Sequence, residues 1–296
     1  YKLNETIDSK DHILSFTVME IDKEGSLWIA LRNGRIYRYD KLKDCFELQV
    51  DLSQSISFPV LNGIEFEENG GLWLSTSTGV YYWNRADKVL SPAGLIGEWT
   101  NCIIKSAENT FFVGTNTEVY KMERAGTTCQ LSKEKMDIPV EARIEALFLY
   151  GTKLYVGTFS NSAFVIDLAT KQVKSLDSFI PGIPVRVFAH DGDHSILIGA
   201  DGAGVFRIDA ANETLTEHYI MDEDDERSLN GNTVSDICVD EYGGIWVSTC
   251  TNGISYLDPN VPDVHWIRHE RNNPSSLVSD HVNVMLQDSE GDYWYG

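Results

Sequence analysis

Residues 233–258 of the chain read TVSDICVDEYGGIWVSTCTNGISYLD, and this stretch decides the fold. Its apolar, β-prone segments predict three short strands at 234–239, 245–248 and 254–257. Asp240, Gly243 and Gly244 predict a turn between the first two strands, because glycine adopts turn geometry that other residues resist. Asn252-Gly253 is a strong hairpin signal and predicts the second turn.

The stretch recurs along the chain around an anchor residue, which is Trp246 in this copy. Three further copies also have tryptophan at the anchor, namely Trp28, Trp73 and Trp294. An acidic residue lies six positions before each of the four anchors: Asp22, Glu67, Asp240 and Asp288. A glycine lies three positions before each anchor: Gly25, Gly70, Gly243 and Gly291. Weaker copies place Phe112, Tyr155 and Leu197 at the anchor. We expect the anchors to pack between neighbouring sheets as core residues.

The spacing of the anchors predicts the architecture. Subtraction gives spacings of 45, 39, 43, 42, 49 and 48 residues. That period, with about four short strands per unit, is typical of a β-propeller. We therefore predict an all-β fold, a single seven-bladed β-propeller over residues 1–296. The blades are expected at 11–58, 59–98, 99–140, 141–180, 181–230, 231–279 and 280–296 plus 1–10. The last blade is either truncated or closed by the N-terminal strand, with Tyr1 to Asn4 as its outer strand; a piece of a longer array is the alternative.

Composition limits the partners of the chain. The formal net charge is 24 − 45 = −21, which disfavours nucleic acid and anionic membrane surfaces as partners. No apolar run approaches the roughly 18 residues of a membrane helix, so this segment is not expected to insert into a membrane. The five cysteines are an odd number without a Cys-x-x-Cys motif, and we expect buried free thiols rather than a disulfide scaffold.

A ligand site is predicted where the first strands of the blades enter a propeller's central channel. The residues eleven positions before the anchors are expected there, and six of the seven are polar: Thr17, Asn62, Asn101, Ile144, Arg186, Ser235 and Asn283. Amide and guanidinium groups beside an aromatic face suit a carbohydrate. We predict ligand binding by Arg186, Trp99, Asn62, Asn101, Arg143, Ser235 and Asn283. The alternative is that polar residues merely line a water-filled channel.

Two segments give a resemblance to a known family. ERSLNGNTVSDICVD and PSSLVSDHVNVMLQD, before the last two tryptophan anchors, match each other closely. The pattern resembles the two-component regulator propeller repeat. It consists of Ser-Leu, a turn, Val-x-x-Ile/Met-x-x-Asp-x-x-Gly-x-x-Trp and then Gly-Ile-x-Tyr-Leu-Asp. The resemblance is strong in blades 1, 2, 6 and 7 and weak in blades 3, 4 and 5. The family usually has Gly-Thr two residues after the tryptophan, where this chain has Ala-Leu or Ser-Thr.

The resemblance implies a function for the parent protein. These repeats form the extracytoplasmic sensor of hybrid two-component systems of Bacteroides-type bacteria, together with a second propeller, a β-sandwich, a membrane helix and cytoplasmic kinase and regulator domains. It therefore implies a periplasmic, ligand-sensing propeller without enzyme activity or a cofactor of its own. The implied partners are an oligosaccharide and the other extracytoplasmic domains of the same protein. Pairing with a second copy is left open.

Two other classes of function remain open from the sequence. One is a structural or protein-interaction propeller with no ligand. The other is a metal-dependent lyase, which needs a histidine and a carboxylate near the first strands; His12 and His281, beside Asp11 and Asp280, are the candidates. Because no motif of a catalytic or metal site is present, we assign no catalytic and no metal-binding residue.

Overall fold

Short antiparallel strands dominate the structure. The computed structural model describes residues 16–125, 129–139, 141–192, 194–225, 228–258 and 264–296. These residues form β-strands and one 3-10 turn, η2 (Leu52–Gln54), and contain no α-helix. No helix in this described part is long and apolar enough to cross a membrane. The chain divides into two units, the first made of Tyr1–Asp137, Asp288–Trp294 and Gly296, and the second of Ile138–Gln287 and Tyr295.

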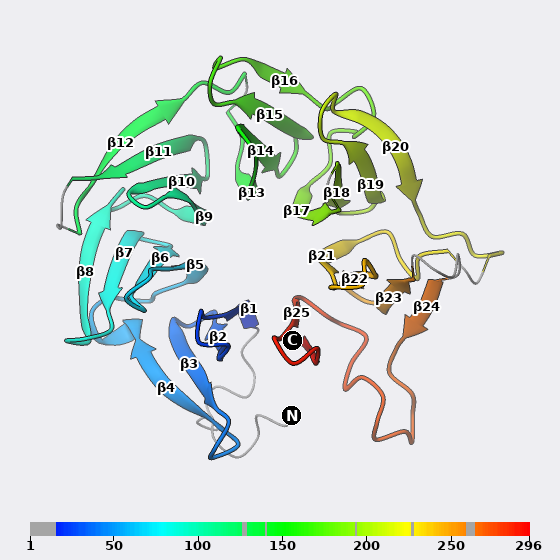
Figure 1. Cartoon of the computed structure of the whole chain (residues 1–296), viewed down its shortest axis with the longest axis horizontal. Coiled ribbons are helices and arrows are strands. Elements are labelled where there is room, and N and C mark those ends of the chain that lie inside the picture. The colour runs from blue at the N-terminus through cyan, green and yellow to red at the C-terminus, as the bar shows by residue number, and fades with distance from the viewer. Residues whose placement is uncertain (1–15, 126–128, 140, 193, 226–227, 259–263) are drawn as a thin grey trace. The chain divides into compact units, whose positions relative to one another are not determined.

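The first unit contains three four-stranded sheets, each with its strands in chain order (Figure 1). The first sheet is β1 (Phe16–Ile21), β2 (Leu27–Leu31), β3 (Arg35–Asp40) and β4 (Cys45–Asp51). The second is β5 (Leu61–Phe66), β6 (Leu72–Thr76), β7 (Gly79–Asn84) and β8 (Val89–Gly94). The third is β9 (Thr100–Ala107), β10 (Thr110–Thr115), β11 (Val119–Arg124) and β12 (Leu131–Met136). Consecutive sheets contact each other mainly through their first strands, β1 with β5 and β5 with β9.

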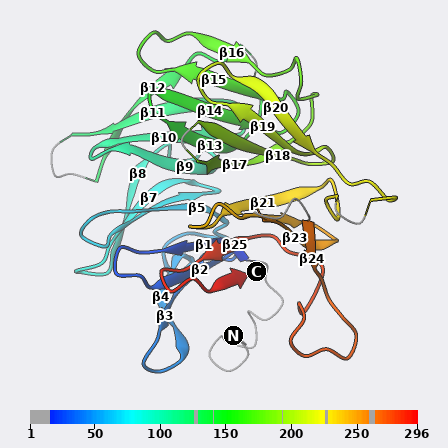
Figure 2. The same cartoon turned by 45° about the vertical axis from the view of Figure 1, so that its right-hand side comes forward.

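The second unit repeats this arrangement, and Figure 2 shows β17 to β20 side by side as in Figure 1. Its first sheet is β13 (Ile144–Tyr150), β14 (Lys153–Thr158), β15 (Ala163–Asp167) and β16 (Val173–Ser175). Its second is β17 (Val185–Asp191), β18 (Ser195–Ala200), β19 (Gly204–Asp209) and β20 (Thr214–Tyr219). Its third is β21 (Val234–Val239), β22 (Ile245–Thr249), β23 (Gly253–Leu257) and β24 (Val264–Ile267). Here too the first strands meet, β13 with β17 and β17 with β21.

The prediction of seven blades is wrong. The described residues form six four-stranded sheets, and the seventh repeat supplies only β25 (Met285–Gln287) and β26 (Tyr293–Tyr295), paired as a two-stranded sheet. A blade needs four strands, and no third strand pairs with β26 in the part of the chain that the structure describes. The expected closure by Tyr1 to Asn4 lies outside the described residues. The fold class is therefore an all-β propeller with six complete blades, which we number 1 to 6 in chain order.

The acid and glycine of each strong repeat build the turn that holds the tryptophan. One carboxylate oxygen of Asp240 accepts hydrogen bonds from the backbone N–H groups of Tyr242 (2.9 Å) and Gly244 (2.7 Å). The other oxygen accepts from Nε1 of Trp246 at 3.0 Å. Gly243 has a φ of 81°, which favours glycine. The same Nε1–carboxylate bond occurs in Trp28–Asp22 (2.7 Å), Trp73–Glu67 (2.9 Å) and Trp294–Asp288 (2.9 Å).

The anchors lie between consecutive sheets, as predicted. Trp73 has no exposed surface, and its ring centroid lies 4.7 Å from that of Phe111 in the next sheet. Tyr155 packs in the same way against Phe188, 6.0 Å away. Removal of such a buried aromatic side chain typically costs about 3–5 kcal/mol of stability. The repeat motif is therefore a structural device that wedges a large side chain between two blades.

The cysteines differ in part from the expectation. All five are free, as predicted, but each is half-buried rather than fully buried. Cys238 lies on β21, whereas Cys250 follows β22 and belongs to the turn before β23. That turn lies at the end of the blade where the predicted ligand residues are found.

Candidate functional site

Two positions of the repeat meet at one end of each blade. The residue eleven positions before the anchor stands near the start of the first strand, and the residue four positions after the anchor stands in the turn between the second and third strands. The antiparallel pairing of the first two strands brings these positions together. The contacts are Asn101 with Asn116 (3.1 Å), Arg186 with Asp201 (2.7 Å) and Ser235 with Cys250 (3.2 Å).

Arg186 organises the most elaborate of these contacts, in the second unit. One terminal nitrogen of its guanidinium donates to Asp201, and the other donates to Glu145 on β13 at 2.8 Å. Burial disfavours the charged form of Arg186, but the hydrogen bond that it donates to Asp201 and the negative charge of Glu145 outweigh this effect, so the pKa of Arg186 is raised. The guanidinium therefore stays charged and fixed between two carboxylates on neighbouring blades.

Arg143 extends this cluster on the other side of Glu145. Its Nε lies 2.7 Å from a carboxylate oxygen of Glu145, without the alignment of a hydrogen bond, so the contact is an ion pair. Arg143 remains half exposed, at 50% of its side-chain surface, whereas Glu145 is buried. One carboxylate thus serves both arginines, and with Asp201 the two positive charges are balanced by two negative charges.

Phe159 supplies an aromatic face to the same cluster. The guanidinium carbons of Arg143 and Arg186 lie 5.5 Å and 6.0 Å from its ring centroid, within cation–π range. The ring nevertheless keeps 44% of its surface exposed. An exposed ring beside fork-shaped donors and a partly exposed carboxylate can contact an apolar ring face while it binds hydroxyl groups at the rim.

Ser235 belongs to the corresponding contact in blade 6, and Asn283 lies on a different segment. Ser235 and Cys250 share a hydrogen bond between Oγ and Sγ, and both are half-buried. Cys250 also lies near enough to Arg186 to interact with its charge. Asn283 is half-buried in the segment just before β25.

The predicted residues of the first unit form a separate group. Nδ2 of Asn62 donates to the backbone oxygen of Thr100 at 2.7 Å and so ties β5 to β9. Trp99 precedes Thr100 and keeps 38% of its surface exposed. Asn101 follows it and donates to Asn116. Asn62 thus joins two blades, while Trp99 and Asn101 present an aromatic face and an amide to solvent.

Reasoning from the sequence named two residues of the cluster around Arg186 and missed three others. It named Arg143 and Arg186, which the structure brings together. It missed Glu145, Phe159 and Asp201, which complete that cluster. The signal was present, because Phe159 and Asp201 each lie four positions after an anchor, but only the strand register shows that this position faces the start of the first strand.

Of the two histidines that a metal-dependent lyase could use, His12 lies outside the described residues. His281 is exposed, and its backbone N–H donates to Ser279 Oγ at 3.1 Å. In the described ranges, no group of three or more His, Cys, Asp or Glu side chains is placed to hold a metal ion.

Comparison with known proteins agrees with the repeat pattern. Residues 228–251 match the family model described as two component regulator propeller, and the expected resemblance is confirmed there. The matched segment begins at the Ser-Leu pair and ends just after the anchor. A search of the curated proteins found no match to this chain.

Solved structures with the same fold include extracellular domains of bacterial two-component and one-component systems. The chain is 22% identical to the extracellular domain of a putative hybrid two component system from B. thetaiotaomicron (TM-score 0.75), covering 95% of this chain and 38% of that one. It is 18% identical to that of a putative one component system from the same organism (TM-score 0.65), covering 95% and 44%. The WD40 propeller domain of Doa1 is also similar, at 12% identity and a TM-score of 0.71, covering 100% and 93%. This chain therefore spans less than half the length of the two bacterial domains, and the likeness shows the propeller fold.

Proposed function

We propose that this chain is a ligand-binding propeller of an extracytoplasmic sensor in a two-component system, and that its ligand is a glycan fragment. The observation that carries the proposal is the exposed ring of Phe159 between Arg143 and Arg186, beside the carboxylate of Asp201. An aromatic face with planar donors and an acceptor around it matches the alternating apolar and hydroxyl surfaces of a sugar ring.

The charge of the cluster supports a neutral sugar. Arg143 and Arg186 are balanced by Glu145 and Asp201, so no net positive charge is available to attract a polyanion. The chain as a whole carries a formal charge of −21, which repels sulfated or uronate-rich chains at long range.

The sensor assignment has two supports. The repeat at 228–251 matches the regulator propeller model, and the fold resembles the extracellular domains of a putative hybrid two component system and of a putative one component system. We infer a binding rather than an enzymatic role for this chain, a periplasmic location, and contacts with other domains of a longer protein. Ligand binding would transmit a signal by favouring one arrangement of those domains over another, in proportion to its differential affinity.

Thermal unfolding of the chain with a panel of neutral and acidic oligosaccharides tests the proposal. A ligand that binds only the native state raises its stability by about 2.7 kcal/mol at a hundred times the Kd. We expect a shift with a neutral glycan that Phe159→Ala and Arg186→Ala each abolish. Trp99→Ala, in the other group of predicted residues, serves as the matched control.

The outcomes separate the alternatives. A shift abolished by Trp99→Ala but kept by Phe159→Ala would move the site to the first unit. A folded chain without any shift across the panel would contradict ligand binding by this propeller and favour a structural role. A shift confined to acidic glycans would contradict the argument from charge balance.

A further inference from the structure

One position of the third strand differs in a single blade. This third-strand residue pairs with the second-strand residue that directly follows the anchor. The strand register identifies it in all six complete blades. Five blades carry an aromatic residue there: Tyr37, Tyr81, Tyr120, Phe164 and Phe206. The sixth carries Ser255, paired with Val247. Blade 6 therefore lacks a ring that every other complete blade has.

The aromatic rings fill the space between consecutive blades. Phe206 is 1% exposed and packs in one core cluster with Leu176 and Ile180, from the segment that joins its blade to the preceding one. Tyr81 packs in the corresponding cluster of blades 1 and 2, with Ile56 from the connecting segment. The ring is needed there because the blades diverge towards their outer strands and leave a wedge to be filled.

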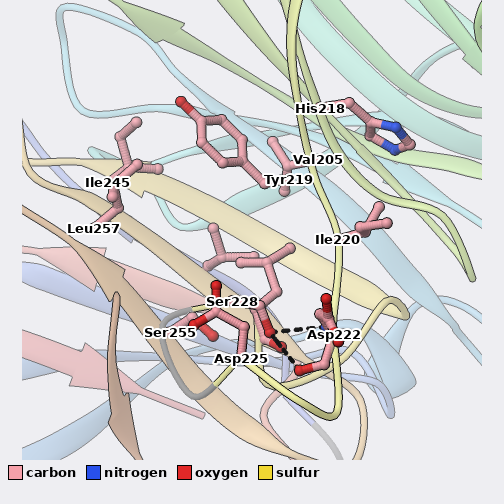
Figure 3. A pocket seen from close by; sticks show the side chains of 12 residues that line it. Val205, His218, Tyr219, Ile220, Asp222, Asp225, Ser228, Ile245, Ser255 and Leu257 are labelled. Atoms are coloured by element: carbon pink, nitrogen blue, oxygen red, sulfur yellow. Dashed lines mark hydrogen bonds between the residues drawn. The ribbon is translucent and has the colours of Figure 1, made fainter. Parts of the chain in front are cut away.

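A pocket of about 260 Å³ lies where the ring is missing, between blades 5 and 6 (Figure 3). Its walls are mostly apolar and come from both blades and their connecting segment: Val205, Tyr219, Leu229, Ile245, Val247 and Leu257. An apolar cavity of about 150 Å³ already accepts a benzene molecule, so one ring fits this pocket.

Ser255 does not refill the space but makes local hydrogen bonds. Its Oγ accepts from the backbone N–H of Asn230 at 3.1 Å and donates to the side-chain oxygen of Asn230 at 2.9 Å. These bonds turn the hydroxyl toward the connecting segment. The pocket wall beside Ser255 is therefore left to the apolar side chains.

Carboxylates stand at the rim of the pocket. Asp222 and Asp225 line it, and Ser228 fixes their loop (Figure 3). Ser228 Oγ accepts from the N–H of Asp222 at 2.8 Å and donates to its carbonyl oxygen at 3.0 Å. His218 also lines the pocket, with its Nε2 2.8 Å from the carbonyl oxygen of Ala203. The two carboxylates outnumber this single imidazole, so they favour a ligand with a positive charge and disfavour a carboxylate.

We propose that this pocket binds a small arylalkylamine, whose aromatic ring takes the place of the missing side chain and whose ammonium group, at the end of a short alkyl chain, faces Asp222 and Asp225. The site is separate from the cluster around Arg186 and uses none of its residues. A ligand held there contacts both blades and the segment that joins them. The sensor would thereby gain a second input.

Titration of the whole chain with 2-phenylethylamine tests the proposal. We expect saturable binding by calorimetry, with nuclear Overhauser effects from the phenyl protons to the methyl groups of Val205, Leu229 and Ile245. Ethylamine, which lacks the ring, should not bind. Phenylacetate should bind about tenfold more weakly, because its charge is repelled at the rim.

A pair of matched substitutions locates the site. Leu257→Trp places a ring where blade 2 has Trp83, and it should weaken binding at least about tenfold by filling the pocket. Leu215→Trp makes the same change at an exposed position of β20 outside the pocket, and it should leave the affinity unchanged.

Three results would overturn the proposal. The first is no binding of 2-phenylethylamine at millimolar concentration. The second is binding that Leu257→Trp leaves intact, or, if that variant does not fold, Overhauser contacts to other methyl groups in the native chain. The third is binding of ethylamine or phenylacetate that is as tight as the binding of 2-phenylethylamine.

Discussion

Blades 2 and 6 follow the same rules and end in different surfaces. Both hold their tryptophan through a carboxylate six residues earlier, and both place a glycine of positive φ three residues before it. At the position opposite the residue after the anchor, blade 2 has Tyr81 and blade 6 has Ser255. In blade 2, Tyr81 packs in the core cluster that blades 1 and 2 share, whereas in blade 6 a pocket is left beside Ser255.

Three positions of the repeat are fixed by the geometry of one turn, whereas other positions can differ from blade to blade. The acid, the glycine and the tryptophan are linked by hydrogen bonds within one hairpin, so they must change together. The third-strand residue that pairs with the residue just after the anchor only fills space between blades, so it can be exchanged at the cost of a cavity. The residues at the start of the first strand can also vary, because they are partly exposed to solvent.

The largest expected effect is on stability, and it differs between the anchors of blades 2 and 6, Trp73 and Trp246. Trp73→Ala should lower the free energy of unfolding by about 3–5 kcal/mol, because the ring is fully buried between Tyr82 and Phe111. Trp246→Ala should cost less, about 2 kcal/mol, because that ring is half-buried. Urea unfolding of both variants measures the difference. As a control, Trp99→Ala, at an exposed site, should lower the free energy of unfolding by less than about 1 kcal/mol. Equal losses for Trp73→Ala and Trp246→Ala would contradict the difference in packing between blades 2 and 6.

A substitution in blade 2 should reproduce the pocket of blade 6. Tyr81→Ser removes the ring between blades 1 and 2 and should cost about 2–4 kcal/mol, since the surrounding side chains relax only partly. Tyr81→Phe keeps the ring and loses only the hydroxyl contact with Thr78, so it should cost under about 1 kcal/mol. Chemical unfolding compares the two variants. If Tyr81→Ser were as stable as Tyr81→Phe, the ring would not be needed to fill the space between blades.

A smaller effect is the pH dependence of stability, which should have opposite signs for the carboxyl groups of Asp236 and Asp22. Burial raises the pKa of Asp236 to about 6, although its oxygens accept N–H bonds from Met285 and Ile237. The folded chain therefore binds this proton more tightly than the unfolded chain, whose Asp titrates near 3.8. As pH rises from about 4 to about 6, the folded state should lose up to about 3 kcal/mol through this group.

Asp22 should behave in the opposite way. Burial disfavours its charge, but hydrogen bonds from Trp28 and Ser26 and the charge of Arg38 lower its pKa below 3.8. Its stabilisation is present above pH 3.8 and is lost only as pH falls through its lower folded value. Unfolding measured from pH 3 to 7 should show that Asp236→Asn flattens the slope between about 4 and 6, whereas Asp22→Asn alters stability without flattening that window. An unchanged slope in Asp236→Asn would contradict the assignment.

The sequence alone determined the blade and its repeat. The acid, glycine and tryptophan lie within seven residues of one another, and turn geometry and hydrogen bonding over so short a distance depend little on the rest of the chain. The strand patterns and the role of the anchors followed for the same reason. The resemblance to the regulator propeller repeat rested on these local residues as well.

The number of complete blades and the chemistry of their surfaces follow from strand pairing and packing in the folded chain. Whether a repeat becomes a blade depends on strand pairing, and the last repeat supplies only β25 and β26. The cluster of Glu145 and Arg186 joins residues 41 positions apart, and the pocket beside Ser255 lies where this small side chain meets the space between blades 5 and 6. Such contacts depend on strand register and on packing between blades. The repeat pattern in the sequence predicts each blade, but it does not predict which side chains of neighbouring blades come into contact.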